Sequence, residues 1–184
     1  MRKRRLFSAL IFVIPAVLAV ATFAVANEGG ERQFRAGMIG YQEVPAVSTV
    51  ATGSFEAQLV DNETLTYTLT YSGAEGAVTQ AHIHFGQRSV NGGISVWLCS
   101  NLASPPTPAG TQPCPPTSGT VTGTITAAHV VGPAAQGIAP SQFNEFVRAL
   151  RAGVAYANVH SITFPGGEFR GQINDRDQRT DNSN

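Results

Sequence analysis

Lysine is almost absent from this 184-residue chain, since the only one is Lys3, inside the basic run at residues 2–5. Charged residues make up 13% of the chain, with 12 basic and 12 acidic side chains. All four residues of that run are basic, so the sequence that follows is mildly acidic. Nucleic acids and anionic lipids are recognised by clusters of basic side chains. This balance therefore excludes a nucleic-acid-binding protein and offers no basic patch to a lipid surface.

Signatures of catalysis are also missing from the sequence. It contains no G-x-S-x-G motif of a serine nucleophile, and its carboxylates are not paired in a recognisable frame for acid–base catalysis. Cysteine occurs only twice, without the C-x-x-C spacing of redox and zinc sites. We therefore predict that the protein is not an enzyme.

Long apolar runs are absent except at residues 6–20, directly after the basic run. An A-x-A pattern at 24–26 then precedes a polar stretch, as in a secretory signal that is cleaved after Ala26. An uncleaved membrane anchor is the alternative, and Pro15 argues against it. We predict a signal peptide at residues 1–26 and a secreted, periplasmic or cell-surface protein, with no membrane insertion after cleavage.

The two cysteines, Cys99 and Cys114, flank a segment that contains four prolines. An even number of cysteines in an exported chain favours a disulfide. A closed loop of this length would stabilise the fold by about 3 kcal/mol. A catalytic or metal-binding cysteine pair is the alternative. We predict a Cys99–Cys114 disulfide.

What the sequence does contain is a series of short segments in which apolar and polar residues alternate. Residues 64–71 are the clearest, because Leu65, Tyr67, Leu69 and Tyr71 alternate with threonines. Such patterns, bounded by turn residues, predict about eight strands. They lie at residues 34–39, 53–60, 64–71, 78–85, 94–99, 119–125, 154–161 and 167–173.

One segment has the periodicity of a helix. Phe143, Phe146 and Leu150 recur at helical spacing, with Ser141 as the predicted N-cap and Gly153 at the end. We predict an all-β domain, an antiparallel β-sandwich or flattened barrel of about eight strands with one short helix in a crossover. The domain spans residues 33–174, between a flexible lead-in at 27–32 and a disordered polar tail at 175–184.

Three of the four histidines lie in two of the predicted strands. His82 and His84 point to the same face of one strand because side chains alternate, and His160 lies in another. Three imidazoles suit copper or zinc, and Glu168 could complete the set or orient one ring. Ligands of one ion require the imidazole nitrogens of the three histidines to converge to within about 4 Å of one another.

A structural polar cluster without a metal is the alternative. Asn158, Tyr156 and Arg170 are available as hydrogen-bonding partners, and Gln80 belongs to the same polar cluster. Buried polar groups gather because each unpaired one costs about 1 to 3 kcal/mol. Under both interpretations we expect strands 78–85 and 154–161 to lie together and to bring Gln80 and Asn158 into one cluster with the histidines.

Several segments, taken in order, resemble the CHRD domain, the module named after chordin. They are residues 34–51 (FRAGMIGYQEVPAVSTVA), 65–67 (LTY), 81–84 (AHIH) with Gly86, and 166–173 (GGEFRGQI). The resemblance covers residues 33–174. It departs from the family at Ala46, where many members have a second proline.

The resemblance implies a secreted or cell-surface β-domain from a family without an agreed biochemical activity. In chordin, such domains belong to an extracellular antagonist of bone morphogenetic proteins, and that partner does not carry over to a stand-alone domain. We therefore predict a non-enzymatic binding or structural surface module whose partner is an unknown protein or surface ligand. The alternative is an extracytoplasmic metal-binding protein with copper or zinc at the three histidines.

Overall fold

The computed structural model describes residues 32–103 and 106–174. The predicted signal peptide and the predicted polar tail lie outside these residues. All eight predicted strands are present. They are β1 (Gln33–Ile39), β2 (Thr52–Leu59), β3 (Leu65–Ser72), β4 (Val78–Phe85), β5 (Gly93–Ser100), β6 (Gly119–Ile125), β7 (Ala155–Ser161) and β8 (Phe169–Ile173).

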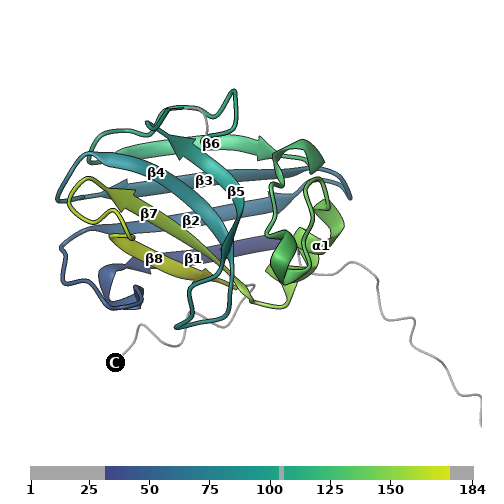
Figure 1. Ribbon diagram of the computed structural model, residues 1–184, viewed down its shortest axis with the longest axis horizontal. Coiled ribbons are helices and arrows are strands. Elements are labelled where there is room, and N and C mark those ends of the chain that lie inside the picture. The colour runs from purple at the N-terminus through teal and green to yellow at the C-terminus, as the bar shows by residue number, and fades with distance from the viewer. Residues whose placement is uncertain (1–31, 104–105, 175–184) are drawn as a thin grey trace, which may run out of the picture.

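The strands form one antiparallel sheet in the order β5–β4–β7–β8–β1–β2–β3–β6. The sheet curls on itself into a nearly closed barrel, which Figure 1 shows with the helix at one end. The predicted antiparallel, mostly β architecture is therefore confirmed. The order places β4 beside β7, although the two strands are far apart in the sequence.

A disulfide-bonded loop bridges the seam between the edge strands β5 and β6. The predicted Cys99–Cys114 disulfide is present. Within this loop, the side-chain amide of Gln112 donates hydrogen bonds to the carbonyls of Leu98 in β5 and Thr122 in β6, at 3.3 Å and 2.9 Å. It also donates to the Tyr67 hydroxyl at 2.9 Å. The loop therefore links two strands that do not pair through their backbones.

The single α-helix among the described residues, α1 (Phe143–Arg151), packs an apolar face against the core. Phe146 and Leu150 are fully buried there. The predicted N-cap is wrong, because Gln142 precedes the helix and Ser141 has a positive φ of 69°. Short 3-10 helices connect other elements, at Gly40–Gln42 (η1), Ala127–His129 (η2) and Ala134–Gln136 (η3).

The two halves of the sheet differ in what covers their outer face. Along β1 and β3, buried and exposed or partly exposed residues alternate, so one face packs on the core and the other faces solvent. In β7 and β8 every residue is buried. Their inner face carries core residues such as Val159 and Phe169. Their outer face must therefore be covered as well, and it is there that the polar residues gather.

Candidate metal centre

The pairing of β4 with β7 brings the predicted histidines together on the outer face of the sheet. Gln80 lies opposite His160, and His82 lies opposite Asn158. Ile83, between the two β4 histidines, is fully buried in the core on the other face. The alternation of side chains thus separates an apolar inner row from a polar outer row.

The three histidines form one compact group. Their rings contact one another, with centroids 5.3 Å apart for His82 and His84, 5.1 Å for His82 and His160, and 6.2 Å for His84 and His160. Each ring offers one nitrogen such that all three nitrogens lie within 4.8 Å of one another. This spread is slightly wider than the 4 Å expected from the sequence. The exposed fractions are 1% for His82, 9% for His84 and 7% for His160.

Backbone carbonyls fix which nitrogen carries the proton in two of the rings. His84 Nδ1 lies 3.0 Å from the Gly92 carbonyl oxygen, and His160 Nδ1 lies 3.0 Å from the Pro165 carbonyl oxygen. A carbonyl oxygen can only accept, so both Nδ1 atoms must carry hydrogen. In the neutral ring the lone pair is then on Nε2. Both Nε2 atoms are buried without a hydrogen-bond partner, and so are both ring nitrogens of His82.

Burial keeps all three rings neutral. It lowers the pKa of His82 to about 2, with smaller contributions from the charges of His160 and His84. Burial also lowers the pKa of His84 to about 4, against the effect of its hydrogen bond to Gly92. The pKa of His160 is lowered for the same reason. At neutral pH the group therefore presents uncharged imidazoles, which is the form that binds metal ions.

Loops cover the histidines and hold them in place. The loop after β4 supplies Gly92, whose N–H donates to the Tyr156 hydroxyl at 3.1 Å and whose carbonyl accepts from His84. The loop between β7 and β8 supplies Pro165. From the segment after η1, Glu43 accepts a 3.0 Å hydrogen bond from Asn158. These contacts explain why β7 is buried on both faces.

Two further residues of the predicted site, Arg170 in β8 and Glu168 just before this strand, have different surroundings. The Arg170 guanidinium donates to the carbonyls of Gln42 and Val90 and to Asn91 Oδ1, and its Cζ lies 4.5 Å from the centre of the Tyr156 ring. It forms no ion pair with a described carboxylate. Glu168 accepts hydrogen bonds from the Thr49 hydroxyl and the Glu75 N–H, at 2.9 Å and 2.8 Å. Its role beside the histidines stays a prediction.

Two residues near the group were not singled out for the site from the sequence. Glu43 is 6% exposed, and burial raises its pKa to about 7 despite the Arg170 charge and the Val44 N–H, which lower it. Trp97 lies opposite His82 in β5, with ring centroids 4.2 Å apart. Alternation along β5 could have indicated Trp97, because Val96 and Leu98 on either side of it belong to the core. Nothing local to Glu43 predicts its burial.

The fourth histidine, His129, lies apart from the group. It is exposed at the end of η2, where its Nδ1 lies 3.1 Å from the backbone nitrogen of Thr126 and accepts a hydrogen bond.

The model of the CHRD domain family matches residues 34–173. The chain belongs to the CHRD domain family. No curated protein and no solved structure matches it.

Membership fits an extracellular module. CHRD domains are typically extracellular, and the Cys99–Cys114 disulfide of this one suits an oxidising compartment. No helix within residues 32–103 and 106–174 is long and apolar enough to cross a membrane.

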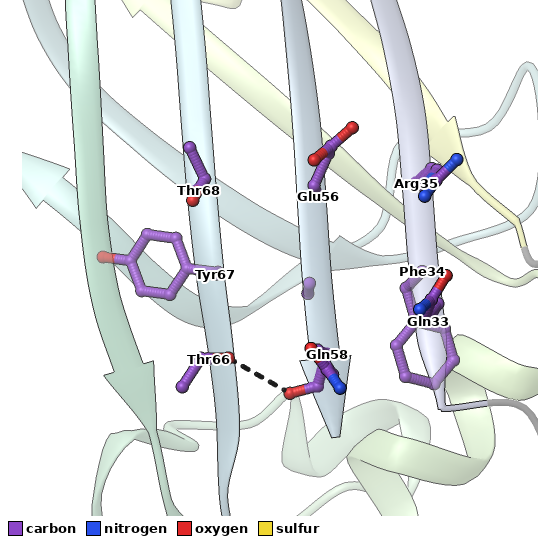
Figure 2. A pocket seen from close by; sticks show the side chains of 9 residues that line it. Gln33, Phe34, Arg35, Glu56, Gln58, Thr66, Tyr67 and Thr68 are labelled. Carbon is purple, nitrogen blue, oxygen red and sulfur yellow. Dashed lines mark hydrogen bonds between the residues drawn. The ribbon is translucent and has the colours of Figure 1, made fainter. Parts of the chain in front are cut away.

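The CHRD domain has a second polar surface on the opposite half of the sheet. Residues of β1, β2 and β3 line a depression with a volume of about 230 Å³. Figure 2 shows their side chains. The Arg35 and Glu56 side chains lie on neighbouring strands there, and Thr66 donates a 3.4 Å hydrogen bond to the Gln58 carbonyl. None of the histidines lines it.

Proposed function

We propose that this CHRD domain is a non-enzymatic, extracytoplasmic module that binds one transition-metal ion, copper or zinc, through His82, His84 and His160. One observation carries the proposal: the Nε2 lone pairs of His84 and His160 are buried without partners beside a third ring that has none either. Unpaired buried polar atoms cost about 1 to 3 kcal/mol each. Bonds to a shared ion would remove that cost.

The hydrogen bonds of the rings support this assignment. Metal-bound histidines usually donate their other ring N–H to a carbonyl or carboxylate, which fixes the ring's orientation. His84 and His160 both do so, to Gly92 and Pro165. Ligands about 2.0 Å from one ion lie roughly 3.4 Å apart, so the group must contract slightly. His82 is suited to move, because neither of its nitrogens is held by a hydrogen bond.

A thermal melt with and without each ion tests the proposal. An ion that binds only the folded state stabilises it by about 2.7 kcal/mol at 100 times its Kd. We expect Zn²⁺ or a copper ion to raise the melting temperature of the wild type and of His129→Ala, the matched control outside the group. The rise should be lost in His84→Ala and in His160→Ala.

Unchanged melts of the wild type with every ion would overturn the proposal. The three rings would then be a structural cluster, in which a water could accept from His82 and donate to the other two. Circular dichroism of each variant separates a lost site from a lost fold.

A module that acts only through a protein or surface ligand is the second candidate. The depression over β1, β2 and β3 favours it, because polar side chains of both charges line its floor. Charge reversal at Arg35 or Glu56 would then weaken partner binding, while substitution of the histidines would change stability alone.

A further inference from the structure

We infer that the three-histidine site selects monovalent copper over Zn²⁺. This inference rests on the proposed function, since it names the ion that the same site takes. The donors are three neutral imidazoles. No carboxylate oxygen belongs to the group. Glu43 accepts a hydrogen bond from Asn158, and Glu168 accepts from Thr49 and Glu75 through Oε1. No anionic ligand therefore offsets the charge of a bound ion.

The coordination number favours an ion that needs only three donors. Zn²⁺ with three protein ligands ordinarily keeps water or substrate at a fourth position. The unpaired nitrogens of the site are inaccessible to solvent, and His82 is 1% exposed. A closed site with three nitrogen donors leaves a Zn²⁺ ion under-coordinated. Monovalent copper has a filled d shell, is stable with two or three donors and requires no water.

A fixed positive charge near the site opposes a divalent ion most. The Arg170 guanidinium lies over Tyr156, and the Tyr156 ring is stacked on His84 with centroids 4.8 Å apart. At a separation of about 10 Å and an effective dielectric constant of about 20, each unit of ionic charge costs roughly 15-fold in affinity. A divalent ion loses this factor for each of its two charges, so its affinity falls by roughly 15-fold more than that of a monovalent ion.

Trp97 places an uncharged aromatic ring beside the site and provides a fluorescence signal for ion binding. It is the only tryptophan of the chain, and its ring lies against His82 with centroids 4.2 Å apart. An aromatic face attracts a desolvated cation without adding a negative charge. Because an ion on His82 would be next to the indole, binding should change Trp97 fluorescence.

Anaerobic competition titrations test the inference on the full protein. Copper kept monovalent with ascorbate is titrated against bicinchoninate, and Zn²⁺ against a zinc-binding dye, with Trp97 fluorescence recorded in both. We expect one equivalent of monovalent copper and an affinity at least about 15-fold above that for Zn²⁺. His129→Ala should behave as the wild type, and His160→Ala should lose binding of both ions.

A matched pair of variants isolates the charge. Arg170→Lys and Arg170→Gln both lose the guanidinium's hydrogen bonds, and only the second loses its charge. We expect the ratio of Zn²⁺ to copper affinity to be roughly 15-fold higher in Arg170→Gln than in Arg170→Lys. Zn²⁺ binding as tight as copper in the wild type would overturn the inference and leave the proposed function intact. Failure of both ions to bind would overturn the proposed function itself.

Discussion

The Tyr156 ring lies flat against the His84 ring, with centroids 4.8 Å apart and planes inclined by only 4°. Both side chains also bond to one residue of the covering loop, since Gly92 donates to the Tyr156 hydroxyl and accepts from His84 Nδ1. Because β7 lies between β4 and β8, Tyr156 also lies between His84 and Arg170. Tyr156 therefore couples the candidate site to the loop above it and to the cation beside it.

Substitution of Tyr156 should separate these roles. Tyr156→Phe keeps the ring and leaves the Gly92 N–H without its acceptor, so we expect a loss of about 1 to 3 kcal/mol in the free energy of unfolding. Tyr156→Leu also removes the contacts with His84 and Arg170 and should cost about 1 kcal/mol more. Urea denaturation at pH 7 measures both. Equal stability of Tyr156→Phe and the wild type would contradict the role of the hydroxyl.

The histidines should make the fold sensitive to acid. Their pKa is about 6.5 in the unfolded chain, while in the folded chain it is about 2 for His82, about 4 for His84 and lowered for His160. Below pH 6.5 the unfolded state binds protons that the folded state excludes. Stability is therefore full above pH 6.5 and falls as pH decreases toward 4, by up to about 1.4 kcal/mol per pH unit for each histidine.

Urea denaturation between pH 4.5 and 7.5 checks this dependence. His82→Leu should flatten the profile, and His129→Ala, at the histidine outside the group, is the control substitution. A profile as steep in His82→Leu as in the wild type would show that His82 is not the buried neutral ring described here.

Glu43 should act in the opposite direction. Burial raises its pKa from 4.5 to about 7, so its favourable contribution is present below pH 4.5 and lost as pH rises through 7. In Glu43→Gln the side-chain oxygen can still accept the hydrogen bond from Asn158, but the side chain cannot ionise. We expect the variant to gain up to about 3 kcal/mol relative to the wild type between pH 4.5 and 8. A stability difference independent of pH would contradict this.

The contact between β1 and β8 should tolerate no side chain at Gly171. A Cβ there would collide with the Gly37 carbonyl oxygen and lie 3.0 Å from Met38 Cγ. We expect Gly171→Ala to cost more than about 2 kcal/mol, because backbone atoms must move. Gly37→Ala is the matched control, since a Cβ at Gly37 meets nothing within 4 Å. Calorimetric melting of both variants measures the difference.

Reduction of the Cys99–Cys114 disulfide should destabilise the domain by about 3 kcal/mol, because the unfolded chain gains the entropy of an open loop. Urea denaturation with and without a phosphine reductant measures this loss. A variant with both cysteines replaced by alanine provides the control, because the reductant should not affect it.

The strands could be predicted because local patterns specify them. The alternation from Leu65 to Tyr71 survives in the structure as buried and more exposed positions in turn. The α1 N-cap could not be predicted in the same way. Ser141 has a residue type that favours capping, but its N–H bonds to the Val130 carbonyl, so a contact with another segment sets its backbone.

The histidine group was only partly predictable. The spacing of His82 and His84 placed them on one face, because alternation is a local rule. The presence of His160 depends on the β4–β7 pairing, which no local pattern specifies. The loops that cover the histidines were not predicted. The burial of Glu43 and the contacts of Arg170 with backbone carbonyls depend on these segments, so they were not predicted either.

The position of β8 next to β1 has a consequence for how the domain folds. Arg35, near the start of the described chain, exchanges two 3.0 Å backbone hydrogen bonds with Asn174 at its end. β1 can pair with β2 early, but it cannot pair with β8 until this last strand of the domain has formed. Contacts between residues so distant in sequence slow folding. We expect this domain to fold slowly for its size, with β8 docking as the late step that also places Arg170 beside the histidines.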